Sequence, residues 1–123
     1  MRSSNKPLNA GDIIFIDLNP TVGREMKSSD KSGERPVLVI TPAAFNNAAL
    51  TWVVPITQGG NIARVQGFSI SLTGTGTQIQ GVIDTSQIRS LDVRQRGYRF
   101  AEKVPDYITQ EVIDRIVNIL GNT

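Results

Sequence analysis

Apolar residues along this chain fall in short runs that glycines and polar stretches separate. Residues 11–18 and 33–40 flank a loop rich in Gly, Ser and charged residues, a pattern typical of two paired strands. A helix of only one or two turns is expected at 43–47. Residues 51–56 then predict a third strand, which we expect at an edge or an end because Pro55 cannot donate to a ladder.

The second half of the chain combines strands with one helix. Residues 67–72 alternate between apolar and polar positions, and we expect them to pair with 79–88 across a glycine turn. At the C-terminus, apolar residues recur at helical spacing between Pro105, which suits a first turn, and Gly121, which suits a helix end. These apolar positions are Ile108, Val112, Ile113, Ile116, Val117, Ile119 and Leu120. The pattern predicts an α+β fold: a small antiparallel sheet closing toward a barrel, flanked by a C-terminal amphipathic helix of about four turns.

Length and composition predict one domain over residues 1–123, long enough to form a core without disulfides or a structural metal. Residues 1–10 are polar, so we expect a flexible lead-in without an export signal. Hydrophobic residues make up 39% and charged residues 20%, and no apolar run approaches the roughly 20 residues of a membrane span. We therefore expect a cytoplasmic protein.

The chain contains neither cysteine nor histidine. This composition excludes disulfides, thiolate nucleophiles, the usual zinc ligand sets and imidazole acid–base catalysis. Five of the thirteen cations lie close together in the sequence: Arg89, Arg94, Arg96, Arg99 and Lys103. Such a cluster suits an anionic partner, but from the sequence alone a solvated charged loop is an equal alternative.

Two residues at predicted strand ends could bind phosphate. Arg35 is held at a loop–strand junction by the proline that follows it, and a fixed guanidinium can stabilise a phosphoryl group that gains charge. Its alternative role is an ion pair with Glu25 or Glu34. Thr57 follows the third predicted strand, where its hydroxyl could bind phosphate or serve only as a turn residue. The mixed-charge loop 21–34 could close over a charged polymer, although a solvated hairpin loop is commoner.

The segments 33–40, 42–47 and 54–61 occur in an order that resembles the MazF/PemK family, the ribonuclease toxins of bacterial toxin–antitoxin pairs. The resemblance extends over about 11–120, and the motif at 59–68 is similar to the Kid/PemK and ChpB branch. It implies a CcdB/MazF-like, SH3-like version of the α+β fold and a homodimer. It also implies a cognate antitoxin, which we expect to bind through an acidic, initially disordered segment that mimics RNA phosphates.

The resemblance also implies which residues act. In the family, an arginine in a Gly-x-Arg-Pro motif and a threonine after the third strand bind the scissile phosphate; Arg35 and Thr57 occupy these positions. A first-loop glutamate in a Gly-x-Glu pattern matches Glu25, the available general base. The implied reaction needs neither metal nor cofactor: an RNA 2′-hydroxyl attacks, leaving 2′,3′-cyclic phosphate and 5′-hydroxyl ends. Six further residues are our candidates for contacts with single-stranded RNA: Arg24, Gln58, Arg64, Ser86, Gln87 and Arg89.

Three positions depart from that branch. Arg24 stands where its members have a histidine, and Asp84 and Ser86 replace the members of an Arg-x-Asp pair. A catalytically weakened relative that binds RNA or an antitoxin is therefore one alternative. A CcdB-like gyrase poison is a weaker one, because those toxins end in a tryptophan-containing tail whereas the only tryptophan here is Trp52.

Overall fold

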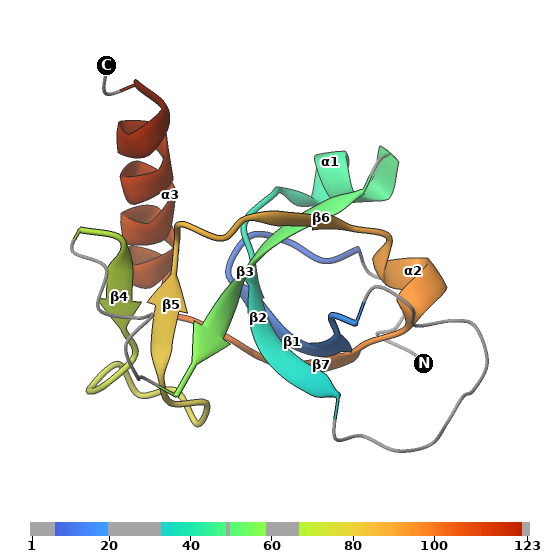
Figure 1. The fold of residues 1–123 in the computed structure, drawn as a ribbon, viewed down its shortest axis with the longest axis horizontal. Coiled ribbons are helices and arrows are strands. Elements are labelled where there is room, and N and C mark those ends of the chain that lie inside the picture. The colour runs from blue at the N-terminus through green and yellow to red at the C-terminus, as the bar shows by residue number, and fades with distance from the viewer. Residues whose placement is uncertain (1–6, 20–32, 49, 59–66, 122–123) are drawn as a thin grey trace.

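Seven strands and three helices make up the described part of the chain (Figure 1). The structure is a computed structural model that describes residues 7–19, 33–48, 50–58 and 67–121. In chain order the elements are β1 (Asp12–Asp17), β2 (Glu34–Val39), α1 (Ala43–Ala48), β3 (Thr51–Thr57), β4 (Ser69–Ser71), β5 (Val82–Asp84), β6 (Arg89–Leu91), α2 (Val93–Arg96), β7 (Arg99–Lys103) and α3 (Asp106–Gly121). The predicted α+β class is confirmed.

The strands form one antiparallel sheet in the order β4-β5-β3-β2-β1-β7, with β6 paired to β3. Strand β3 pairs with β6 from Thr51 to Val53 and then with β5 at Ile56 and Thr57. Pro55 lies between these two ladders. Our expectation of an edge or end position for Pro55 is wrong, because β3 is central and accommodates the proline where it changes partner.

The two faces of the sheet carry separate hydrophobic cores, since successive residues of a strand point to opposite faces. Ile13 and Leu38 pack on one face with Val112 of α3. Ile14 and Val37 pack on the other face, in a core to which β1, β2, β3 and β6 contribute. In Figure 1 these strands and β7 curve around one another. All five side chains are fully buried. The sheet curls toward a barrel, but β4 and β7 remain the two ends of the described strand order.

Helix α3 follows the predicted amphipathic pattern and ends at the predicted glycine. Ile108 and Val112 are buried, and Ile116 is packed against the same core. The C-terminal half projects past the sheet (Figure 1), where Val117 is 60% and Leu120 is 75% exposed. The sequence pattern thus gives the helix, but only its first turns bury the apolar face. None of the described helices is both long and apolar enough to span a membrane.

The predicted pairing of 67–72 with 79–88 is confirmed in a shorter form. Strand pairing covers Ser69–Ser71 and Val82–Asp84. The chain then turns after Asp84, because the carboxylate of this residue accepts hydrogen bonds from Ser86 and Gln87, two and three residues further along.

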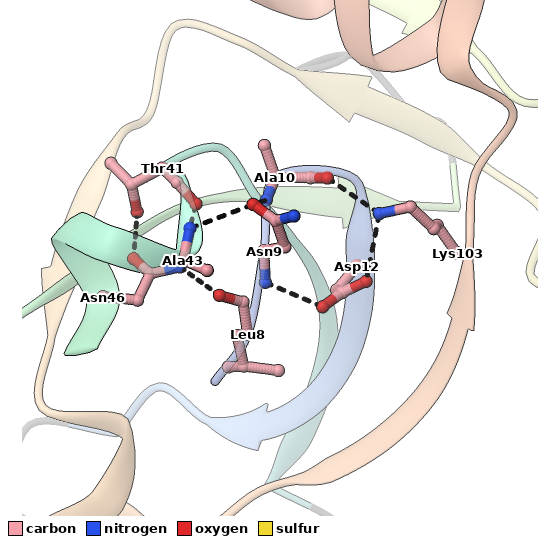
Figure 2. Close-up of polar contacts among 8 residues, drawn as sticks. All are labelled: Leu8, Asn9, Ala10, Asp12, Thr41, Ala43, Asn46 and Lys103. Atoms are coloured by element: carbon pink, nitrogen blue, oxygen red, sulfur yellow. Dashed lines mark hydrogen bonds and ion pairs between the residues drawn. The ribbon is translucent and has the colours of Figure 1, made fainter. Parts of the chain in front are cut away.

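A buried polar network fixes the start of the described chain to α1 (Figure 2). The Asn46 side-chain amide donates to the backbone oxygens of Leu8 and Thr41, both at 2.8 Å. The Thr41 hydroxyl donates to Asn46 Oδ1, and Asn9 Oδ1 accepts from the backbone N–H of Ala43 at 2.9 Å. Within the expected flexible lead-in, Leu8 and Asn9 are thus tied to α1, whereas 1–6 lie outside the described residues. The Thr41 hydroxyl oxygen also accepts from the backbone N–H of Trp52 in β3 at 3.1 Å, so the network holds α1 beside the start of β3.

Candidate functional site

Arg35 and Thr57 lie at the same end of neighbouring strands, on the same face of the sheet. The β2–β3 register pairs Val37 with Pro55, and Arg35 and Thr57 each lie two residues beyond that pair toward the same end. Side chains two residues apart on a strand share a face, so both point to the side of Val37 and Pro55. The structure therefore brings together the two residues expected to bind phosphate.

The guanidinium of Arg35 is exposed and does not pair with its neighbour Glu34. Glu34 points to the opposite face of β2, where its Oε1 accepts from Arg99 Nη2 at 3.0 Å. Arg99 also lies over the ring of Phe15, 4.7 Å from its centre. An Arg35–Glu34 ion pair is thereby ruled out, and none of the salt bridges within the described residues involves Arg35. The alternative partner Glu25 lies outside the described residues.

Thr57 is held by an unusually close approach of β5. Its Cα partner is Val82, and Gly81 precedes that pair with a φ of +133°. A Cβ at Gly81 would lie 2.3 Å from the Thr57 backbone oxygen and 3.2 Å from Ile56 Cγ2. Only a residue without a side chain fits there. Gly81 therefore lets β5 approach the end of β3 closely, and this approach sets the position of Thr57. The sequence does not predict this role, because a lone glycine beside a turn carries no signal for the strand it contacts.

The turn after β5 is built around Asp84. Its carboxylate is only 1% exposed and accepts from the backbone N–H and hydroxyl of Ser86 and from the side-chain amide of Gln87. Asp84 and Val82 share the face of Thr57, because Val82 is the Cα partner of Thr57 and Asp84 lies two residues further on. The Asp-x-Ser spacing is typical of an Asx turn and is the sequence signal for this role.

Arg89 and Gln58 lie beside these groups. Arg89 opens β6 and is paired with Val53, so it points to the same face as Pro55 and Thr57. Gln58 follows Thr57 directly, and its amide donates to the Gln80 backbone oxygen at 3.2 Å. Five predicted site residues, Arg35, Thr57, Ser86, Gln87 and Arg89, therefore come from elements that meet on one face of the sheet.

The remaining predicted site residues, Glu25, Arg24 and Arg64, lie outside the described residues, and their roles stay predictions. Within 7–19, 33–48, 50–58 and 67–121, no group of three or more carboxylates is placed to hold a metal ion. Besides the buried Asp84 carboxylate, the described face carries guanidinium, hydroxyl and amide groups. Such groups bind phosphate and the edges of nucleobases.

Comparisons with known proteins agree with this arrangement. A family model described as "PemK-like, MazF-like toxin of type II toxin-antitoxin system" matches residues 9–120. Endoribonuclease PemK of Escherichia coli is 44% identical over 114 residues, which cover 92% of this chain and 82% of that protein. Endoribonuclease toxin ChpB of E. coli K12 is 35% identical, covering 86% of this chain and 88% of its own. The solved MazE–MazF structure (Form-I) of Deinococcus radiodurans has a TM-score of 0.72 at 27% identity, with 94% of this chain and 97% of that chain covered. The resemblance drawn from the sequence is confirmed, and the chain belongs to the PemK-like, MazF-like toxin family of type II toxin–antitoxin systems.

Proposed function

We propose that this protein is the toxin of a toxin–antitoxin pair and acts as a metal-independent endoribonuclease on single-stranded RNA in the cytoplasm. Its relatives PemK and ChpB are named endoribonucleases. The observation that carries the proposal is the shared face and strand end of Arg35 and Thr57. Arg35 is exposed there, while Glu34 is paired with Arg99 on the other face. A fixed cation beside a hydroxyl suits the binding of a scissile phosphate.

In the proposed reaction, the 2′-hydroxyl of the RNA attacks the adjacent phosphorus. Glu25 removes the hydroxyl proton, Arg35 stabilises the charge of the phosphorane, and Thr57 binds a phosphoryl oxygen. The bond from phosphorus to the 5′-oxygen breaks, that oxygen takes up a proton from solvent water, and Glu25 returns its proton to solvent. The products are a 2′,3′-cyclic phosphate and a 5′-hydroxyl. No atom of the reaction requires a metal ion.

The protein partners are an antitoxin and a second copy of the chain. A similar protein has been solved as a MazE–MazF complex. The cations Arg35 and Arg89 on one face suit an acidic, disordered antitoxin segment that competes with RNA for this surface. For the homodimer, support comes from the C-terminal half of α3, whose Val117 and Leu120 are exposed. Burying such apolar side chains against a second copy is favourable.

The test is digestion of a defined single-stranded RNA with excess chelator, followed by analysis of the fragment ends. We expect 2′,3′-cyclic phosphate and 5′-hydroxyl ends, and a fall of at least about a hundredfold in turnover for Arg35→Ala. Arg94→Ala is the matched control, because Arg94 is exposed on α2 and its guanidinium donates a hydrogen bond to Asn47 Oδ1, on α1 and away from Arg35 and Thr57. Cleavage that requires added magnesium would contradict the mechanism. A folded protein that binds RNA without cutting it would favour the weakened relative instead.

A further inference from the structure

The buried carboxylate of Asp84 organises two exposed side chains. Oδ1 accepts from the Ser86 hydroxyl at 2.6 Å and from the Ser86 backbone N–H at 3.0 Å, and Oδ2 accepts from Gln87 Nε2 at 2.9 Å. Three donors on a carboxylate that is 1% exposed satisfy its charge within the protein. Asp84 is therefore neither an available base nor a group that meets an RNA phosphate. Its effect must pass through Ser86 and Gln87.

These hydrogen bonds decide what Ser86 and Gln87 present to solvent. The Ser86 hydroxyl has a single proton, and that proton points to Asp84, so the outward side of its oxygen can only accept. A carboxylate cannot donate, so the Gln87 amide must turn Nε2 toward it, which fixes the direction of Oε1. The turn thus presents two acceptors, Ser86 Oγ and Gln87 Oε1, beside one remaining amide N–H.

The turn connects β5, which pairs with Thr57, to β6, which begins at the candidate RNA contact Arg89. Asp84 lies two residues after Val82, the partner of Thr57, and Arg89 lies two residues after Gln87 and opens β6. Both connected strands pair with β3, so the turn follows the edge of β3 beside Pro55, two residues before Thr57. A strand of RNA whose phosphate is bound at Arg35 and Thr57 would place a neighbouring base against this turn.

We propose that Ser86 and Gln87 read one nucleobase of the RNA, selecting bases with an exocyclic amino group over uracil, and that Asp84 is their positioning residue. The inference rests on the proposed ribonuclease function. Adenine, cytosine and guanine carry an amino group that can donate two hydrogen bonds, whereas uracil has a single N–H on its pairing edge. Two neighbouring acceptors match the amino group and leave uracil short of a donor. The substituted Asp84 and Ser86 would thus serve specificity, not proton transfer.

The test begins with fragments from a random single-stranded RNA pool, which identify the position where an amino-bearing base is preferred. We then compare kcat/KM on that RNA and on the same RNA with purine, 2-pyrimidinone or hypoxanthine in place of adenine, cytosine or guanine. Each analogue lacks only the amino group. For the wild-type protein, removal of the amino group should lower kcat/KM about tenfold, the value of about one net hydrogen bond. For Gln87→Ala, the same removal should change kcat/KM little. Ser86→Ala should also weaken the dependence of kcat/KM on the amino group, but less than Gln87→Ala does.

The controls separate reading from folding and from catalysis. Ser90→Ala and Gln95→Ala change exposed residues of the same types and should keep the full dependence on the amino group. In Asp84→Asn, kcat/KM should no longer depend on the amino group, while the rate on the RNA without the amino group is retained. If Asp84→Asn does not fold, Ser86→Ala and Gln87→Ala test the inference. The inference would be overturned if Gln87→Ala still lost about tenfold in kcat/KM when the amino group is removed, that is, if the substitution lowered kcat/KM equally on both RNAs. Such a result would leave the ribonuclease function standing. If no RNA were cut by the folded wild-type protein, the function itself would fail.

Discussion

Replacing Gly81 by alanine tests whether the close approach of β5 to β3 positions Thr57. The new Cβ would lie 2.3 Å from the Thr57 backbone oxygen, whereas contacts below 3.0 Å essentially do not occur and ordinary contact begins at 3.4 Å. The two backbones must therefore separate by about 1 Å. The Thr57 oxygen belongs to the backbone and cannot rotate away as a flexible side chain could. We expect the end of β3, and with it the Thr57 side chain, to shift.

Two costs contribute to the expected loss of stability. A side chain at a φ of +133° is strained by about 1–2 kcal/mol. Separation of β5 from β3 weakens the pairing of Val82 with Thr57, which adds about 1–3 kcal/mol through lengthened hydrogen bonds and lost packing. Displacement of Thr57 by about 1 Å should also lower kcat/KM about a hundredfold, because catalytic groups tolerate little misplacement.

Gly76→Ala is the matched control for this experiment. Gly76 has a φ of +90°, but no atom lies within 4 Å of the Cβ it would gain. It therefore carries the backbone strain of Gly81→Ala without the collision. Urea unfolding should show Gly81→Ala less stable than Gly76→Ala, and only Gly81→Ala should lose RNA cleavage when both are folded. Equal stability and equal activity of the two variants would refute the argument.

Four further predictions concern the base, the polar network and the two protein partners. Glu25→Gln should lower turnover by about 10²-fold or more through loss of the general base, whereas Ser86→Ala should change turnover by less than about tenfold on the same RNA. The reverse pattern would move the chemistry to the Asp84 turn. Asn46→Ala should lower the free energy of unfolding by about 2–4 kcal/mol, because it leaves the partner carbonyls in Figure 2 without a donor, while the exposed Asn47→Ala should have little effect in the same urea titration. Val117→Asp should dissociate the homodimer in analytical ultracentrifugation at concentrations where the wild type is dimeric, and an unchanged dimer would place the interface elsewhere. A peptide from the acidic segment of the antitoxin should compete with RNA and bind more weakly as salt rises; RNA binding that persists at saturating peptide would exclude a shared surface.

The sequence by itself determined the local elements and the class of fold. Short apolar runs between glycines and polar residues predicted the first three strands, and helical spacing up to Gly121 predicted α3, because both patterns follow from which side chains a single element must bury. The positions of Arg35 and Thr57 at strand ends were also readable, since Pro36 and the glycines after Thr57 mark where regular structure begins or stops. The absence of histidine and cysteine was likewise a property of the chain alone.

Only the tertiary structure decided how these elements combine. The change of partner along β3, which gives Pro55 a place in a central strand, depends on β5 and β6, and these strands are only three residues long and too short to show a period. Whether Glu34 or Arg35 faces the site was decided by register and by the contact of Arg99 with Glu34 across β1. The same holds for the contact of Gly81 with Thr57, 24 positions apart in the numbering of the chain. Contacts between distant segments depend on register, and a shift of one residue would turn each of these side chains to the other face.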